Sequence, residues 1–357
     1  MTAMMEEVVQ QPAALAALRK YYESPGAIPR QTLRKLVTQW PPTVIFTGMG
    51  SSLIAAYPAQ AYLASRGIRA VVSEAAELLH HHLETLRRDA LLVAVSQSGE
   101  TIEITRLLER VAGKVGVAAV VNVERSTLAR HGGLLLPMMA GRQTSVSTKT
   151  YMCSVAVLMY LAFAIADEPH RHLTRVLLQA IHAQERILER RDLSVEPTVE
   201  FFDHPTYVAL MSRGPDMASA LQGALMLKEV VRLAAEPISA AQFRHGPIEI
   251  INPSHRYVLF ARKSKAAPAG RHPANTGALL LKLAQDIQSH GGRVLLFTDL
   301  PFPETVNIRT LRVEPLKLGL GTLIDTLLMQ LLAHELALRA GLEPGRFWIA
   351  EEVTRVE

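Results

Sequence analysis

The sequence predicts an α/β protein with two tandem domains, each built on a doubly wound parallel sheet. Three observations support this fold class. Short apolar runs of strand length alternate with longer helix-like segments, the same order of runs occurs twice at an offset of about 164 residues, and the 357 residues exceed what one ordinary core needs. Strands that alternate with helices of this length are typical of a parallel sheet that helices cover on both faces.

The first half of the chain begins with a helix and continues with four strands. Residues 5–21 have the pattern of an amphipathic helix, which Pro25 and Gly26 end. Helical segments separate the predicted strands, which cover residues 43–48, 69–73, 90–96 and 115–122. An apolar helix over 152–166 follows; it is too short for a membrane span, so we expect it to be buried.

The second half repeats this order after a connecting helix over residues 168–191. Its predicted strands match three strands of the first half in type and cover residues 206–214, 256–261 and 293–299. A helix over 320–339 and a tail complete the chain. We therefore predict an N-terminal helical segment, a first domain, a connecting helix, a second domain and a tail, over residues 1–40, 41–168, 169–200, 201–340 and 341–357.

The composition describes a soluble globular chain rather than a disordered one, since 49% of the residues are hydrophobic and 20% are charged. The net charge is +5, but the arginines are scattered, which favours anionic small molecules over nucleic acid as partners. Cys153 is the one cysteine, so no intramolecular disulfide forms, which fits a reducing cytoplasm. The acidic start "MTAMMEEVVQ" lacks the features of a signal peptide, and we expect no membrane partner.

A cluster of hydroxyl groups follows the third predicted strand, in "VSQSGET" over residues 95–101. Ligands of open parallel sheets bind beyond the carboxyl ends of the strands, where helix N-termini offer free N–H groups to anions. Ser96, Ser98 and Thr101 supply hydroxyl donors, and Gly99 allows close approach of the backbone. Taken alone, the pattern fits phosphate binding and a plain helix N-cap equally well.

Two further stretches favour the phosphate interpretation. "GMGSS" over 48–52 places serines at the helix start after the first strand, and "SVSTKT" over 145–150 opens the long apolar helix. Neither is a Walker A loop or a G-x-G-x-x-G pattern. Three hydroxyl-rich helix starts without a nucleotide fingerprint indicate a phosphate group on a small organic molecule.

These three motifs, in this order and at these intervals, resemble those of the SIS (sugar isomerase) family, whose domains are flavodoxin-like. Residues 223–251 also resemble the isomerase half of glucosamine-6-phosphate synthase, and the likeness covers nearly all of 40–357. The resemblance implies Glu229 as the proton-shuttling base and His245 as the ring-opening residue, which the family supplies from the neighbouring subunit of a homodimer. It implies no metal or organic cofactor. The implied phosphate ligands are Ser52, Ser96, Gln97, Ser98, Thr101 and Ser147.

The residues themselves agree with these two roles but do not require them. Glu229 lies four and eight residues after two leucines, on the apolar stripe of its helix, where desolvation raises the pKa of a carboxyl and suits a base near neutrality. Without the resemblance, an ion pair of Glu229 with Arg232 or Arg244 is the favoured interpretation. A lone loop histidine such as His245 is ordinarily a solvated or capping residue.

The chain departs from the synthase pattern in three places. Where the synthases carry a glutaminase cysteine after the initiator methionine, this sequence has Thr2, and only residues 1–42 precede the first strand, so we expect that glutamine is not the nitrogen source. The lysine that forms a Schiff base in the family's tail corresponds to Glu351 or Glu352, which we expect to contact an ammonium group of the substrate. A further lysine of the family's catalytic helix is Met226.

Three functions follow from this pattern, in order of preference. The first is an amino-sugar 6-phosphate deaminase or isomerase that acts on a hexosamine 6-phosphate such as glucosamine 6-phosphate. The second is a deglycase of a phosphorylated sugar–amine conjugate of the fructosamine 6-phosphate type. The third is a non-catalytic phosphosugar sensor, which needs only the serine pocket, so the presence of Glu229 and His245 favours an enzyme.

Two other polar stretches receive no catalytic role. Adjacent histidines at 80–82 point in different directions on a helix and lack accompanying ligands, so we expect no metal there. "ARKSKA" over 261–266, the counterpart of "SQSGET", lacks the glycine and most hydroxyls, so we expect one phosphate site per chain, in the first domain. We interpret the basic loop 262–272 as solvated, with a role as a lid or anion guide as the alternative.

Overall fold

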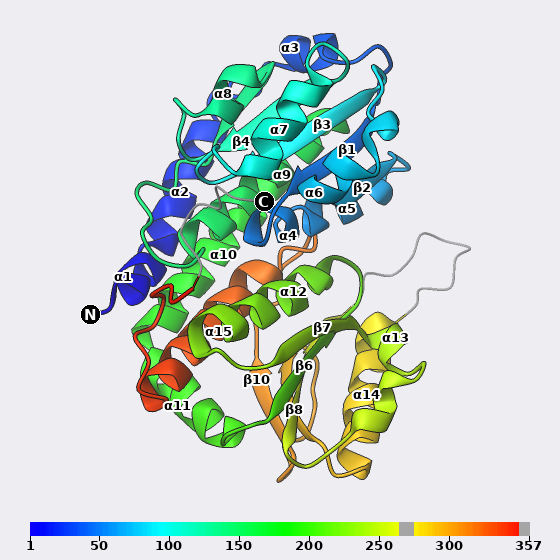
Figure 1. The fold of residues 1–357 in the computed structure, drawn as a ribbon. Helices are drawn as coiled ribbons and strands as arrows, with labels where there is room; N and C mark the ends of the chain where they lie inside the picture. Colours follow the sequence, from blue (N-terminus) through cyan, green and yellow to red (C-terminus); the bar gives the residue numbers. More distant parts are fainter. Residues whose placement is uncertain (264–274, 350–357) are drawn as a thin grey trace. The chain divides into compact units, whose positions relative to one another are not determined.

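The computed structural model describes residues 1–263 and 275–349, which form two compact units (Figure 1). One unit comprises residues 6–182 with 347–349, and the other comprises 1–5 with 183–346. Each contains one five-stranded sheet, with the orders β2-β1-β3-β4-β5 and β10-β9-β8-β6-β7. Both orders are those of a doubly wound sheet, because the chain starts near the middle and winds outward in both directions. The predicted fold class is confirmed.

In the unit that holds residues 6–182, every strand pairs parallel with its neighbours. Strand β3 lies at the centre and is buried over its whole length, as its unbroken apolar sequence predicts. Because β1 and β3 are adjacent and parallel, the loops that follow them leave the same edge of the sheet. The strands are β1 (Thr43–Gly48), β2 (Ala70–Glu74), β3 (Ala90–Ser96), β4 (Gly116–Val121) and β5 (Leu134–Pro137).

Helices cover both faces of this sheet (Figure 1). On one face, α6 (Ala75–His80), α7 (Ile102–Val111) and α8 (Thr127–His131) contribute leucines to a shared core with the strands. Helix α9 (Lys149–Ile165) lies on the other face and is buried over all of its residues, with α2 and α5 against it. The other helices are α1 (Ala3–Val9), α2 (Gln11–Tyr22), α3 (Arg30–Lys35), α4 (Ser51–Ile54) and α5 (Tyr57–Ala64), with a 3₁₀ turn over Leu83–Thr85.

The apolar run that includes Cys153 is this buried helix α9. Burial raises the pKa of the Cys153 thiol to about 12, so the group behaves as an inert core side chain. Within residues 1–263 and 275–349, no helix combines the length and apolar character that crossing a bilayer requires.

The second sheet repeats the topology of the first. Strands β6, β8 and β9 occupy the places of β1, β3 and β4, so the repeated order of apolar runs marks equivalent strands. The strands are β6 (Tyr207–Ser212), β7 (Ala235–Ser239), β8 (His255–Ala261), β9 (Arg293–Thr298) and β10 (Ile308–Arg312). After α10 (Arg171–Glu189), the helices are α11 (Arg191–Phe202), α12 (Met217–Met226), α13 (Ala240–Phe243), α14 (Thr276–Ser289) and α15 (Thr322–Arg339), with a π-helix over Leu227–Val231 and 3₁₀ turns over Gly214–Asp216 and Pro247–Ile250.

The structure differs from the sequence interpretation at one helix boundary and at the edges of the sheets. The helix predicted over 5–21 is two helices, because Pro12 stands in the first turn of α2 and cannot donate a backbone hydrogen bond. Strands β5, β7 and β10 were not predicted, and each ends its sheet. The edge strands β7 and β10 lack a continuous apolar run, and β7 even contains Pro237, whereas β5 is apolar but only four residues long.

Candidate functional site

The hydroxyl-bearing loops after β1 and β3 gather at one edge of the first sheet. Ser96 is the last residue of β3. Ser52 lies in the first turn of α4, which a loop of two residues joins to β1. Ser96 is buried, whereas the other predicted ligands of these loops are half-buried and so combine fixed positions with access to a ligand: Ser52, Gln97, Ser98 and Thr101.

The loop over 96–101 is held by its own hydroxyl groups. Ser96 Oγ accepts a hydrogen bond from the Gly99 amide at 3.0 Å and shares another with Thr101 Oγ1 at 2.9 Å. Thr101 occupies the N-cap position of α7, yet its side chain accepts no hydrogen bond from the helix. The plain N-cap alternative therefore does not describe Thr101, and the positive end of the α7 dipole remains available to an anion.

Gly99 is required by the loop itself. Its φ of +68° is left-handed, and a Cβ atom built there would lie 2.1 Å from Ser126 Oγ. The Gly99 carbonyl also accepts a hydrogen bond from the Leu128 amide at 3.0 Å. The sequence interpretation that Gly99 admits the ligand stays a prediction; in addition, its missing side chain makes room for Ser126, because α8 packs against the loop there.

Replacing Gly99 by alanine is expected to destabilise the protein by about 2–5 kcal/mol, as measured by chemical denaturation. The left-handed backbone costs roughly 1–2 kcal/mol for alanine, and the steric overlap with Ser126 adds roughly 1–3 kcal/mol. Gly113→Ala is the matched control, because Gly113 also has a left-handed φ, of +71°, but open space around its Cβ position. Equal losses in the two variants would contradict the steric argument.

The third hydroxyl loop precedes α9 and carries Ser147, which is half-buried. Gln143 Oε1 accepts hydrogen bonds from the amides of Thr148 and Thr150, at 3.3 and 3.1 Å, and from Thr150 Oγ1 at 3.0 Å. Ser147 Oγ lies 3.0 Å from Thr150 Oγ1. The Gln143 side chain thus fixes the start of α9, and the half-buried Ser147 hydrogen-bonds to this network through Thr150 Oγ1.

Asn122 joins two of the three loops, a role that the sequence interpretation missed. The Asn122 amide N–H donates to the Gln97 carbonyl at 3.1 Å, and its side chain bonds both Gly141 and Ala140 at 2.7 and 3.1 Å. It therefore ties the "SQSGET" loop to the segment that leads into "SVSTK". The sequence signal that could have revealed Asn122 is its position directly after β4, at the same edge of the sheet.

Glu229 belongs to the other unit and lies on a π-helix, Leu227–Val231, that continues α12. Such π turns occur frequently at functional sites. The side chain is half-buried, and burial raises its pKa to about 7 against an opposing effect of Lys228. Among the described residues, none forms an ion pair with Glu229, and Arg244, one proposed partner, pairs with Asp286 at 2.6 Å. Within the described chain, the ion-pair alternative therefore does not hold for Glu229.

His245 is exposed and follows α13 in the same unit as Glu229. Its backbone amide donates to the Gln242 carbonyl at 2.9 Å, and within the described chain its ring forms no hydrogen bond. Its action in a neighbouring subunit of a homodimer stays a prediction. Glu351 and Glu352 lie outside the described residues.

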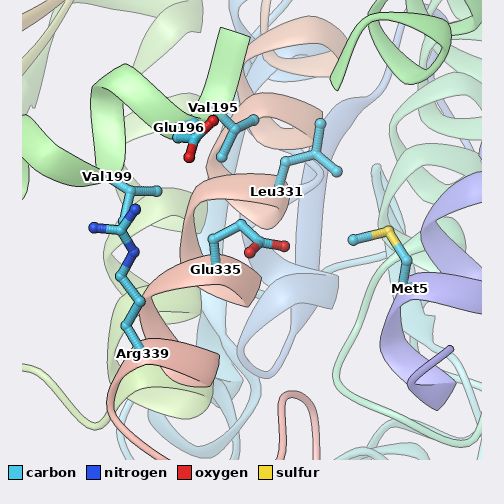
Figure 2. A pocket seen from close by; sticks show the side chains of 7 residues that line it. All are labelled: Met5, Val195, Glu196, Val199, Leu331, Glu335 and Arg339. Atoms are coloured by element: carbon cyan, nitrogen blue, oxygen red, sulfur yellow. The ribbon is translucent and has the colours of Figure 1, made fainter. Parts of the chain in front are cut away.

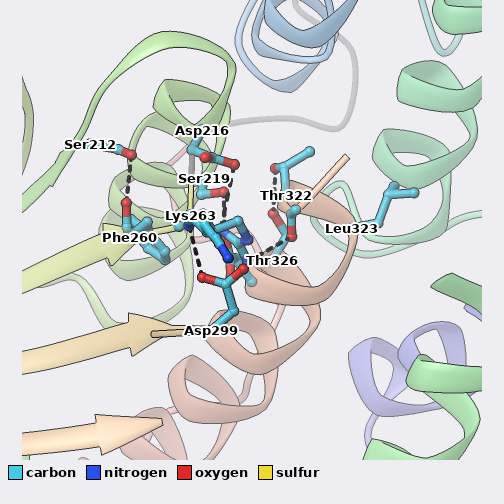
Figure 3. A network of polar contacts seen from close by, with 12 residues as sticks. Ser212, Asp216, Ser219, Phe260, Lys263, Asp299, Thr322, Leu323 and Thr326 are labelled. Atoms are coloured by element: carbon cyan, nitrogen blue, oxygen red, sulfur yellow. Dashed lines mark hydrogen bonds and ion pairs between the residues drawn. The ribbon is translucent and has the colours of Figure 1, made fainter. Parts of the chain in front are cut away.

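The counterpart of the serine loops in the second sheet is an internal ion pair (Figure 3). Arg262, directly after β8, binds both carboxylate oxygens of Asp325 at 2.5 and 2.7 Å. Ser219 Oγ donates to the same carboxylate at 2.6 Å, and Asp216 lies 3.4 Å from the guanidinium. The interpretation of loop 262–272 as solvated is therefore wrong for Arg262, because the buried Asp325 needs a counter-charge; residues 264–272 lie outside the described ranges.

A cavity of about 210 Å³ opens elsewhere in that unit, between α1, α11 and α15 (Figure 2). Apolar side chains and the charged Glu196, Glu335 and Arg339 line it together. None of the predicted site residues that the structure describes lines it. The lining residues are Met5, Val195, Glu196, Val199, Leu331, Glu335 and Arg339.

No group of three histidine, cysteine, aspartate or glutamate side chains in residues 1–263 and 275–349 has an arrangement that could hold a metal ion. The rings of His80 and His81, within the adjacent histidines, have centroids 6.3 Å apart.

Comparison with known proteins connects these loops to a family. Residues 37–165, which carry all three hydroxyl loops, match the SIS domain. The glutamine–fructose-6-phosphate aminotransferase (isomerizing) of Zymomonas mobilis is 28% identical over 354 residues, covering 95% of this chain and 56% of that protein. Its Escherichia coli counterpart is 27% identical over 281 residues, covering 75% and 44%. The chain thus spans about half the length of the curated relatives it matches.

Solved structures share the fold across both units. The C-terminal domain of glucosamine-fructose-6-phosphate aminotransferase from Francisella tularensis has a TM-score of 0.85 at 20% identity, covering 97% of this chain and 98% of that one. Glucosamine-6-phosphate deaminase from Thermotoga maritima has a TM-score of 0.71 at 18% identity, covering 99% of each chain. Tagatose-6-phosphate ketose/aldose isomerase from Escherichia coli has a TM-score of 0.78 at 18% identity, covering 98% and 97%. The three hydroxyl loops thus lie in a segment that matches the SIS domain, and similarity to an isomerizing aminotransferase extends over 95% of the chain.

Proposed function

We propose that this protein is a phosphosugar isomerase that acts on a hexosamine 6-phosphate and releases its amino group as ammonia. The observation that carries the proposal is Glu229, a half-buried carboxyl on a π-helix whose pKa burial raises to about 7. Both of its protonation states are populated at neutral pH, so it can accept a proton and return it. A sensor needs no such group.

The phosphate group of the substrate binds at the edge of the first sheet. Half-buried hydroxyls surround the start of α7, whose N-terminal N–H groups receive no cap from Thr101. Short donors around a helix N-terminus suit an anion of this size. The proposed phosphate ligands are Ser52, Ser96, Gln97, Ser98, Thr101 and Ser147.

The reaction first moves the C2 proton to C1, and then water hydrolyses the product. In the open-chain amino aldose, which His245 helps to form, Glu229 removes the proton from C2 and an enolamine results. Return of the proton to C1, with one amino N–H proton passing to the former aldehyde oxygen, leaves an imine at C2 and a hydroxyl at C1. Water hydrolyses this imine to a ketose phosphate and ammonia, so the nitrogen comes from the substrate. The tail positions of the family's Schiff-base lysine are Glu351 and Glu352, which cannot form that bond.

Ammonia release from a panel of 2-amino-2-deoxyhexose 6-phosphates tests this function. We expect release with stoichiometric ketose 6-phosphate from at least one member of the panel and none from the same hexosamine without its phosphate. Cleavage of a ketosamine 6-phosphate without ammonia from any member would identify the deglycase instead, since that reaction uses the same proton transfer. Binding of phosphosugars without turnover of either class would identify a sensor.

A further inference from the structure

We propose that Glu7, in helix α1, is a positioning residue of the phosphate site that acts through the loop carrying Ser147. The inference rests on the proposed function only in that Ser147 receives the phosphate group. The sequence interpretation gave the N-terminal segment no role in the site. The contacts of Glu7, all within one compact unit, assign it one.

The Glu7 carboxylate is buried and accepts five hydrogen bonds from the segment 144–148. Its Oε1 accepts from the Thr144 amide at 2.5 Å, from Thr144 Oγ1 at 3.1 Å and from the Ser145 amide at 3.3 Å. Its Oε2 accepts from Ser145 Oγ and, at 3.4 Å, from Thr148 Oγ1. The five donors exceed the roughly four lone-pair directions of a carboxylate, so its capacity to accept hydrogen bonds is filled.

This arrangement replaces the secondary structure that the loop lacks. The amides of Thr144 and Ser145 precede α9 and belong to no helix or strand, and the Glu7 carboxylate accepts a hydrogen bond from each of them. Hydrogen bonds to a carboxylate are stronger than those between neutral groups, which suits it to fix an irregular backbone. Gln10 continues the contact by accepting from Lys149 Nζ at 2.6 Å, which draws this lysine toward the N-terminal helices.

The result is a loop in which Ser147 keeps a hydroxyl that can turn to a ligand. Thr148 Oγ1 is engaged by Glu7 and Gln143, at 3.4 Å each, and Thr150 donates to Gln143. Because the amide oxygen of Gln143 only accepts, Thr150 has no hydrogen left, and Ser147 donates to it at 3.0 Å. Rotation of the Ser147 hydroxyl redirects that hydrogen to a phosphate oxygen without disturbing the loop.

The variant Glu7→Gln tests the proposal, with Glu6→Gln as the matched control on the exposed face of the same helix. An amide offers one accepting oxygen in place of two, so we expect Glu7→Gln to raise the KM for glucosamine 6-phosphate, and its Kd by calorimetry, roughly tenfold to a hundredfold. We expect kcat to change less than about threefold, because the reacting carbons are not displaced once the substrate is bound. A lower melting temperature with an unchanged KM at 25 °C would mean a merely structural role and overturn the proposal.

Combined variants show whether Glu7 acts through Ser147. Adding Ser147→Ala to Glu7→Gln is expected to raise KM far less than Ser147→Ala does alone. In the double variant of Ser98→Ala and Glu7→Gln, by contrast, the two fold-changes in KM are expected to multiply. Fold-changes in KM that multiply fully in both double variants would overturn the proposal.

Should Glu7→Gln fail to fold, Thr144→Val removes one hydrogen bond to Glu7 from an exposed residue and is expected to raise KM roughly threefold. An unchanged KM in that variant would overturn the proposal. A wild type that binds no phosphorylated ligand overturns both this inference and the proposed function. A wild type that binds, and that Ser98→Ala weakens while Glu7→Gln does not, overturns this inference alone.

Discussion

Replacing Glu229 by glutamine is expected to lower kcat for a hexosamine 6-phosphate by roughly 10²- to 10⁴-fold while changing substrate binding little. Glutamine keeps the size and polarity of the side chain on the π-helix but cannot take a proton. The phosphate ligands lie on the other sheet and are untouched by the change. Steady-state kinetics with the same substrate panel, and calorimetry for binding, measure the two effects separately.

The pH dependence of kcat/KM in the wild type is expected to follow the titration of Glu229. Since burial raises the pKa of Glu229 to about 7, kcat/KM should rise with pH up to about 7 and then level, as the carboxyl becomes the base. The same shift acts on stability in the opposite direction. A carboxyl with a raised folded-state pKa stabilises the fold fully below its ordinary pKa, and this contribution is lost as the pH rises toward 7.

The glutamine variant therefore separates catalysis from folding. It lacks the titration, so it should lose less stability than the wild type as the pH rises toward 7, while turning over substrate far more slowly. Glu249→Gln, which changes an exposed carboxyl of the same unit, is the control and should leave both profiles as in the wild type. Substantial turnover by Glu229→Gln, with the acidic limb of the profile intact, would assign the base to another residue.

The central strands were predictable because both of their faces are buried, so that consecutive residues are apolar. Strand β3 is apolar along its length and buried along its length. The edge strand β10 is buried only at its first residue, so its sequence has no run to detect. The same physics explains why six central strands matched between the halves whereas three of the edge strands were missed.

The candidate site was predictable where its chemistry is local. The hydroxyl loops stand at strand ends and helix starts, which adjacent residues reveal. Glu7 and Arg262 escaped notice because their partners lie far along the chain: Glu7 bonds a loop more than 130 residues away. The π-helix at Glu229 escaped for another reason. It changes the helical register by one residue within an ordinary apolar pattern, which periodicity does not resolve.

Breaking the ion pair between Arg262 and Asp325 is expected to cost the largest amount of stability of any single change considered for this protein. Asp325 is fully buried, and Arg262→Met leaves its carboxylate with the Ser219 hydroxyl as its close partner. Removing one member of a buried pair costs about 3–5 kcal/mol, because the other charge stays desolvated and uncompensated. Chemical denaturation measures the loss directly.

Two comparisons distinguish this account from simple loss of packing. Arg262→Met combined with Asp325→Leu removes both charges and should recover most of the lost stability, since an apolar pair of similar volume can replace a buried ion pair. Arg244→Met breaks a pair whose side chains are about one-third exposed and should cost about 1 kcal/mol or less. Equal losses in the single and double Arg262 variants would mean that the arginine acts by packing. Arg262 binds Asp325 with both outer nitrogens, so it is a structural cation rather than an anchor for phosphate. We therefore expect the double variant to keep the wild-type KM for phosphosugar, which would show that the ion pair takes no part in phosphate binding.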